Sequence, residues 1–170
     1  MKKISISLLA AVSIDGRIAA YSGHKSDWTS KEDKDFLHSM LDASDCVVVG
    51  RNTYEIAREP LSKRNCIVFT NMSEKSDRGT VYFNPAKQDF SVFAKEKKYT
   101  SIAVLGGTGV YTYFLEHDLC TDLWLTIEPV VFGTGLALFE TEKFVMKHFH
   151  LQSSRLLNSN GSILLHYTRL

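Results

Sequence analysis

The sequence has almost no net charge, no long apolar run and few cysteines. Its 20 Lys and Arg residues nearly balance 19 Asp and Glu residues, which leaves a formal charge of +1 at pH 7. A nucleic-acid-binding surface needs a basic excess or stripe, so we expect no nucleic acid partner. No apolar stretch approaches the roughly 20 residues of a membrane span, so we expect no membrane partner. The Ile and Ser alternation near the start is typical of a strand rather than a signal peptide, and we expect a soluble cytoplasmic protein.

The three cysteines do not form a disulfide framework. Cys46, Cys66 and Cys120 are far apart, odd in number, and each lies inside or beside an apolar run. This pattern is typical of buried, reduced thiols in a reducing compartment. His148 and His150 alternate along an expected strand and would share a face, but no third ligand lies near them in the sequence. We therefore expect no metal site.

A chain of 170 residues, 44% of them hydrophobic, is long enough for one domain with a substantial core and too short for two. We expect one domain over residues 1–170, in which apolar strand segments alternate with segments of helical periodicity. This order predicts an α/β fold with a mostly parallel sheet covered by helices and an antiparallel hairpin at one edge. The expected strands span residues 4–12, 45–50, 65–70, 80–83, 101–105, 122–127, 143–155 and 162–169, and the expected helices follow residues 30 and 109 and span 54–58 and 86–98.

Three of the expected buried strands end in glycines or small polar residues. Gly106-Gly107-Thr108-Gly109 and Gly50-Arg51-Asn52-Thr53 each follow a strand and open a helix, and Thr70-Asn71 follows a third strand. Open α/β sheets bind ligands at the carboxyl ends of their strands, and a helix N-terminus offers free N–H groups to an anion. Arg51 adds a permanent charge and a bidentate donor fork. Together the segments predict a site for a ligand with several phosphates, such as a dinucleotide; the alternative for each segment is capping and turn chemistry.

Four segments, in order and spacing, resemble the dihydrofolate reductase-like proteins. Residues 12–19 (Val-Ser-Ile-Asp-Gly-Arg-Ile-Ala) and 26–29 (Ser-Asp-Trp-Thr) are similar to motifs of the reductase domain of bacterial riboflavin biosynthesis and its stand-alone relatives. Residues 49–55 (Val-Gly-Arg-Asn-Thr-Tyr-Glu) and 105–111 (Leu-Gly-Gly-Thr-Gly-Val-Tyr) resemble the two glycine segments of dihydrofolate reductases. The resemblance covers nearly the whole chain and implies a three-layer sandwich with a mostly parallel central sheet, helices on both faces and a C-terminal antiparallel hairpin.

The resemblance also implies a cofactor, the 2′-phosphorylated nicotinamide dinucleotide NADPH. Four groups of residues would contact it: Gly106, Gly107, Thr108, Gly109 and Val110 at the pyrophosphate; Gly50, Arg51, Asn52 and Thr53 on its other side; Thr70 and Asn71 at the adenosine ribose and its 2′-phosphate; and Ala11, Ile18 and Ala19 beside the nicotinamide. The family often has a cis peptide between the paired glycines, which we therefore expect between Gly106 and Gly107.

Hydride transfer to a C=N or C=O bond also needs a proton, delivered by a carboxylic acid or a positioned water. In dihydrofolate reductases an acidic residue on the first helix grips the pterin, and Glu32, Asp33 and Asp35 crowd the corresponding region. Spacing from Phe36 favours Glu32, whereas spacing from the first glycine turn points nearer Lys34. The alternative is that these carboxylates only stabilise the N-terminus of the helix.

Three further side chains are candidates at the substrate end of the site. Asp15 is either a substrate contact or the first residue of an Asp-Gly turn, and Trp28 either walls the pocket or fills the core. Thr126 matches a pocket threonine of the family, although a strand threonine needs no function.

These expectations combine into an NADPH-dependent reductase without a metal, which transfers a hydride to a small heterocyclic, pyrimidine-like or pterin-like substrate. Two alternatives remain open: a dihydrofolate reductase proper, and a non-catalytic NADP-binding regulatory module on the same fold. The riboflavin-type relatives tend to dimerise, so the resemblance also implies a homodimer.

Overall fold

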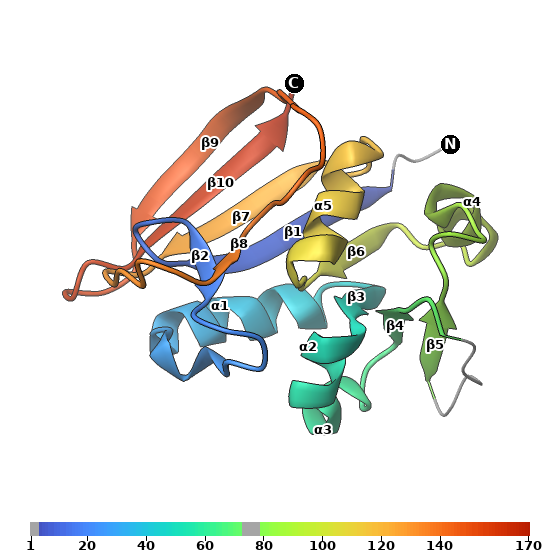
Figure 1. The fold of residues 1–170 in the computed structure, drawn as a ribbon, viewed down its shortest axis with the longest axis horizontal. Helices are drawn as coiled ribbons and strands as arrows, with labels where there is room; N and C mark the ends of the chain where they lie inside the picture. Colours follow the sequence, from blue (N-terminus) through green and yellow to red (C-terminus); the bar gives the residue numbers. More distant parts are fainter. Residues whose placement is uncertain (1–3, 73–78) are drawn as a thin grey trace.

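The computed structural model describes residues 4–72 and 79–170, in which an eight-stranded sheet lies between two layers of helices (Figure 1). The strand order is β5-β4-β3-β6-β1-β7-β10-β9. The parallel strands are β1 (Ser5–Val12), β3 (Cys46–Gly50), β4 (Cys66–Phe69), β5 (Thr80–Phe83), β6 (Ser101–Val104) and β7 (Asp122–Ile127), and β9 (Phe149–Leu156) and β10 (Ile163–Arg169) complete the edge as an antiparallel pair. The short strands β2 (Arg17–Ala19) and β8 (Leu136–Ala137) pair separately.

The central parallel strands are continuous apolar runs because both of their faces are buried. Val47, Val48 and Val49 of β3 expose at most 1% of their surface, and Ile67 and Val68 of β4 expose none. A strand covered on both faces gains nothing from alternating polar residues. The predicted mostly parallel sheet with an antiparallel edge is therefore confirmed.

One face of the sheet is covered by α4 (Phe90–Glu96) and α5 (Thr108–Glu116), which bury a cluster of aromatic rings. Phe69, Phe83, Phe90 and Phe114 have ring centroids 5.0–5.7 Å apart in tilted, stacked and edge-on pairs. Such aromatic pairs add to the free energy that burial alone supplies. This cluster fixes α4 and α5 to β4 and β5.

The opposite face is covered by α1 (Lys31–Asp42), α2 (Arg51–Ile56) and α3 (Arg58–Leu61). Leu41, Tyr54 and Leu61 from these helices pack against Leu9 and Val49 of the sheet. A 3₁₀ turn, η1 (Ser26–Trp28), leads into α1, and the Ser30 side chain caps that helix by accepting a hydrogen bond from the Asp33 N–H group. Helices thus cover both faces, as the three-layer expectation required.

Two predicted helix boundaries are wrong. The helix expected over 86–98 spans only Phe90–Glu96, because the Asp89 side chain caps it by accepting from the N–H groups of Ser91 and Val92. The helix expected over 54–58 is α2, which spans Arg51–Ile56 and ends before Pro60 as predicted, but a separate helix that was not predicted, α3, follows and contains that proline. Proline is tolerated there because N–H groups in the first turn of a helix have no partner within the helix.

The predicted strand over 143–155 is also too long at its start. β9 begins at Phe149, and residues 143–148 are irregular, with the Lys147 ammonium paired to Asp118 at 2.6 Å beyond the end of α5. His148 therefore lies outside the strand that contains His150, and the two do not alternate along one strand. The segment between the strands expected over 65–70 and 80–83, which is polar and was expected to form a loop, lies mostly outside the described residues.

The three cysteines are buried and free, as predicted. Burial raises the pKa of each of the three thiols to about 12, so they stay protonated at neutral pH. Within the described part of the chain, no helix is long and apolar enough to cross a membrane.

Replacing Phe114 by Ala tests the aromatic cluster. The ring is fully buried, so its removal leaves a cavity and should lower the free energy of unfolding by about 3–5 kcal/mol in urea denaturation. Val92→Ala, at a side chain 51% exposed on α4, is the control and should change stability by less than about 1 kcal/mol. A loss at Phe114 no larger than at Val92 would contradict the assignment of this cluster as the core of that face.

Candidate functional site

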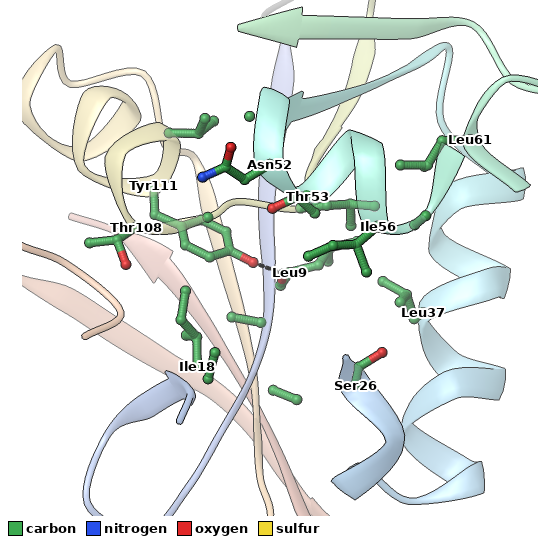
Figure 2. A pocket seen from close by; sticks show the side chains of 18 of the residues that line it. Leu9, Ile18, Ser26, Leu37, Asn52, Thr53, Ile56, Leu61, Thr108 and Tyr111 are labelled. Carbon is green, nitrogen blue, oxygen red and sulfur yellow. Dashed lines mark hydrogen bonds between the residues drawn. The ribbon is translucent and has the colours of Figure 1, made fainter. Parts of the chain in front are cut away.

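A cavity of about 1410 Å³ lies over the carboxyl ends of the parallel strands. Its walls come from the ends of β1, β3, β4 and β7, from β2 and η1, and from the starts of α2 and α5. Figure 2 labels Asn52 and Thr53 of α2, Thr108 and Tyr111 of α5, and Leu37 of α1 among its lining side chains. Segments far apart in the sequence thus meet at one edge of the sheet, as expected for a doubly covered parallel sheet.

The two glycine turns are joined to each other at this edge. The Gly50 N–H group donates to the Gly106 carbonyl oxygen at 2.6 Å, and the peptide bond between Gly106 and Gly107 is cis, as the family resemblance implied. Gly106 has φ +86°, and a Cβ atom there would overlap the ring of Tyr111. The glycine at 106 is therefore required by close packing, and it forms the support behind the cavity wall rather than the wall itself.

The N-terminus of α5 opens into the cavity. Gly107 is its N-cap residue, and no side chain caps the helix. Gly109 is exposed, and no atom lies within 4 Å of the position that a Cβ would take there. The Thr108 hydroxyl donates to the Ala137 carbonyl at 2.6 Å and so fixes this turn to β8. The helix start therefore combines N–H groups, the positive end of the helix dipole and open space for an anion.

A second polar region lies at the end of β4. Thr70 is buried, and its hydroxyl accepts a hydrogen bond from the Met72 N–H group at 3.1 Å. The Arg51 guanidinium reaches the same place, with Nη1 3.0 Å from the Met72 sulfur. Asn71 is exposed beside them on the cavity wall. A permanent positive charge thus lies next to two short polar side chains.

Asp33 is the buried carboxyl group of the cavity. It lies in the first turn of α1, is only 7% exposed, and interacts with the hydroxyl groups of Thr126 and Thr29. Burial raises the pKa of Asp33 above its usual range, and the nearby Glu128 carboxylate raises it further, against the effect of the two hydroxyl groups. A carboxyl group whose pKa is raised at a cavity wall is suited to donate a proton.

An aromatic wall stands beside Asp33. Trp28 lines the cavity, and its ring meets the ring of Phe132 edge-on at 5.0 Å, while His24 packs against both. The Asp15 carboxylate fixes the loop that carries Phe132, because it accepts hydrogen bonds from the N–H groups of Phe132 and Gly133 at 3.2 and 2.9 Å. These bonds and one from the Ser13 hydroxyl lower the pKa of Asp15 to about 2.

The cavity brings together nearly all of the residues expected at the cofactor. Those that line it are Ala11, Ile18, Ala19, Gly50, Arg51, Asn52, Thr53, Thr70, Asn71, Gly107, Thr108, Gly109 and Val110, and Thr126 and Trp28 line the substrate end.

Two candidates for the substrate end do not line the cavity. Glu32 is exposed, and its carboxylate accepts a hydrogen bond from the Asn158 side chain at 3.1 Å. The Asp15 carboxylate instead accepts the hydrogen bonds from the N–H groups of Phe132 and Gly133 and so holds that loop. Helical periodicity could have identified Asp33 in place of Glu32. Residues 33, 37 and 41 lie four apart, so they share the face of α1 that is turned toward the core and the cavity.

An extension of the cavity, which no sequence pattern predicted, runs between α1 and the α2–α3 pair. Leu37 and Leu41 of α1 face Ile56 and Leu61 along this groove. At its outer end lies the Arg64 guanidinium, which pairs with Asp42 at 2.7 Å and is largely covered. The groove is thus apolar along its length and ends at the Arg64–Asp42 ion pair, with Lys63 and Glu59 also on the lining.

The fold is that of an α/β protein with a cavity over the carboxyl ends of its parallel strands, which is where such sheets bind ligands. The chain belongs to the dihydrofolate reductase family, whose model matches residues 5–152.

Three similar proteins put this membership in context. YwjB, an uncharacterised protein of Bacillus subtilis (strain 168), is 28% identical over 171 residues, covering 95% of this chain and 96% of YwjB. RibD of Acinetobacter baumannii shares the fold with a TM-score of 0.81 at 16% identity, over 100% of this chain and 59% of that one. Dihydrofolate reductase of Enterococcus faecalis, solved with NADP(H), has a TM-score of 0.69 at 20% identity, over 97% and 96% of the two chains.

Replacing Asp33 by Asn tests the burial of this carboxyl group. A group whose pKa is raised on folding stabilises the fold when protonated, and this stabilisation is lost as the pH rises from the usual Asp value of about 4 through the folded value. The D33N protein should therefore be more stable than the unsubstituted protein at about pH 7, with the difference shrinking toward about pH 4 in urea denaturation. Asp35→Asn, at an exposed position on the same helix, should give no comparable gain. An equal gain at both positions would contradict a raised Asp33 pKa.

Proposed function

We propose that this protein is an NADPH-dependent reductase that acts on a small heterocycle of pyrimidine or pterin type. The observation that carries the proposal is the joining, in one cavity, of an uncapped helix start and a buried carboxyl group. The first is suited to a phosphate and the second to a proton transfer. Membership of the dihydrofolate reductase family supports the same assignment.

The cofactor end has residues that fit a phosphorylated dinucleotide. The N–H groups at the start of α5 and the space beside Gly109 would accept the pyrophosphate, and Ala11, Ile18 and Ala19 would flank the nicotinamide. When bound, the nicotinamide supplies a hydride. Arg51 and the Thr70 hydroxyl would hold a 2′-phosphate, because a guanidinium and a hydroxyl suit phosphate oxygens. The Enterococcus faecalis relative was solved with NADP(H), which supports this choice of cofactor.

At the substrate end, this chain's own residues would orient the heterocycle and supply the proton that accompanies hydride transfer. The Asp33 carboxyl group would bind the N–H and ring-nitrogen edge of a pyrimidine or pterin, with Thr126 holding its orientation. Trp28, whose ring packs edge-on against Phe132, lines this side of the cavity and would shield a bound heterocycle from water there, which would strengthen its hydrogen bonds.

The groove beyond Leu37 distinguishes two types of substrate, because it has room for a long substrate and is not needed by a compact one. A phosphoribosyl-aminopyrimidine, the type that a riboflavin-biosynthesis reductase takes, is compact and hydrophilic. A dihydrofolate is longer, with a flat apolar middle and a carboxylate end that would match the Leu37 and Ile56 walls and the Arg64 end of the groove. The groove therefore supports dihydrofolate reductase as the second candidate function.

Titration of NADPH against the intrinsic Trp fluorescence of the purified protein tests the proposal. We expect saturable binding in the micromolar range, typical of enzyme sites. Arg51→Ala should weaken NADPH binding by about 10- to 100-fold, because a charge-assisted hydrogen bond to phosphate is lost. NADH, which lacks the 2′-phosphate, should be affected far less. Arg58→Ala, at an exposed arginine outside the cavity, is the control. Equal losses for both cofactors would assign Arg51 to the pyrophosphate, and no binding of either NADPH or NADP would refute the proposal.

Steady-state kinetics with Arg64→Ala separates the two substrate types. If the groove holds a carboxylate tail, KM for dihydrofolate should rise by about tenfold, while turnover of a dihydropterin without the tail should not change. An unchanged KM for dihydrofolate would show that the groove does not contribute to substrate binding. NADPH binding without oxidation in the presence of dihydrofolate, dihydropterin or aminopyrimidine ribosides would favour the regulatory module instead.

A further inference from the structure

Glu128 is a buried carboxylate outside the cavity wall. It follows β7, is 3% exposed, and both of its oxygens accept hydrogen bonds. Oε1 accepts from the Ser30 N–H group and the Ser30 hydroxyl, both at 2.7 Å, and Oε2 accepts from the Ser162 hydroxyl at 2.5 Å. A charge this deeply buried is retained only where several donors compensate its desolvation.

The surrounding bonds fix where the hydroxyl protons point. The Ser30 hydroxyl oxygen accepts from the Asp33 N–H group at 3.3 Å, and the Ser162 hydroxyl oxygen accepts from the Asn158 side chain at 3.0 Å. Each hydroxyl therefore has its proton free to donate to Glu128. Glu128 thus receives three donated hydrogen bonds, two at one oxygen and one at the other.

This carboxylate joins three elements that meet beside Asp33. Ser30 caps α1, in whose first turn Asp33 lies, and Ser162 precedes β10. Glu128 itself stands two residues after Thr126, the hydroxyl neighbour of Asp33. The Ser30 hydroxyl bridges the Glu128 carboxylate and the Asp33 backbone directly. A shift of Glu128 would therefore shift the first turn of α1 relative to β7.

The charge of Glu128 acts on Asp33 as well. It opposes ionisation of Asp33 and so raises its pKa, whereas Lys34 on the same helix acts in the opposite direction. From α5, Tyr111 faces Asp33 as a neutral phenol whose hydroxyl donates to the Leu9 carbonyl. Among the charged groups that act on Asp33, Glu128 is thus the one that favours its acid form.

We propose that Glu128 is a positioning residue of the reductase, which holds the first turn of α1, and with it Asp33, through the Ser30 hydroxyl and places a second buried carboxylate beside that group. This inference rests on the proposed function for its catalytic consequence. Its structural part, the coupling of two carboxyl groups, does not depend on any substrate.

The coupling is tested by NMR titration of the side-chain carboxyl carbons without ligand. In the unsubstituted protein, the Glu128 carboxyl resonance should shift at the midpoint of the Asp33 titration, because each group senses the charge of the other. In the E128Q protein, the midpoint of the Asp33 titration should fall to lower pH. In the control variant Asp35→Asn, the midpoint of the Asp33 titration should not change. A Glu128 resonance that ignores the Asp33 titration would overturn the inference, even if Glu128→Gln does not fold.

The catalytic consequence is tested by the pH profile of NADPH oxidation. With Asp33 as proton donor, the E128Q protein should lose kcat/KM severalfold at the alkaline end of the pH profile and progressively less toward acid pH, while its affinity for NADPH stays unchanged. Glu128→Asp, which keeps the charge, should keep the wild-type profile. A uniform loss at all pH values would reduce Glu128 to a structural role and overturn the proposal. A different outcome is also informative: the NMR titrations of Glu128 and Asp33 could be coupled while the protein oxidises NADPH with none of the substrates. That outcome would refute the reductase assignment but would support the coupling of the two carboxyl groups.

Discussion

Much of the structure depends on the absence of a side chain at residue 106. With no Cβ at Gly106, the ring of Tyr111 packs directly against the turn, and its hydroxyl reaches the Leu9 carbonyl at 2.5 Å. The carbonyl of Gly106 accepts the Gly50 N–H group at 2.6 Å. One close approach thereby ties β6, α5, β1 and the start of α2 together. Because β1, α5 and the start of α2 also line the cavity, the packing that stabilises the sheet is the packing that shapes the site.

The parallel sheet explains how distant motifs become one site. In β1, β3, β4, β6 and β7 the chain runs in one direction, so each strand delivers its last residues to the same edge. Val48 and Val104 are neighbours in register, which brings the glycine turns that follow them into hydrogen-bond contact. The antiparallel edge has a different role. It returns the chain from β9 to β10, and Ser162 at the start of β10 reaches the Glu128 carboxylate.

The strand-end segments that line the cavity could be found in the sequence because their signals are local. A buried strand followed by glycines and a helix specifies both a turn and its place at the sheet edge. The substrate end was less readable, since it depends on which side of α1 faces the sheet. Neighbouring residues on a helix point about 100° apart, so Glu32 and Asp33 have opposite environments although both stand in the first turn. The hydrogen-bond partners of Glu128, Ser30 and Ser162, lie 98 and 34 residues away in the sequence, and no local sequence pattern predicts contacts over such distances.

Two buried carboxyl groups in one neighbourhood work against stability. Desolvation opposes each charge, and the charges oppose one another, so an apolar pair of similar size would pack there at lower cost. Glu128 is compensated by donors from Ser30 and Ser162, whereas Asp33 interacts with the hydroxyl groups of Thr126 and Thr29 and faces the cavity. Burial and the nearby Glu128 charge raise the pKa of Asp33, so Asp33 holds its proton to higher pH than an exposed aspartate does. A proton-donating site requires such a carboxyl group, and the hydrogen bonds that hold Glu128 near it lie outside the cavity.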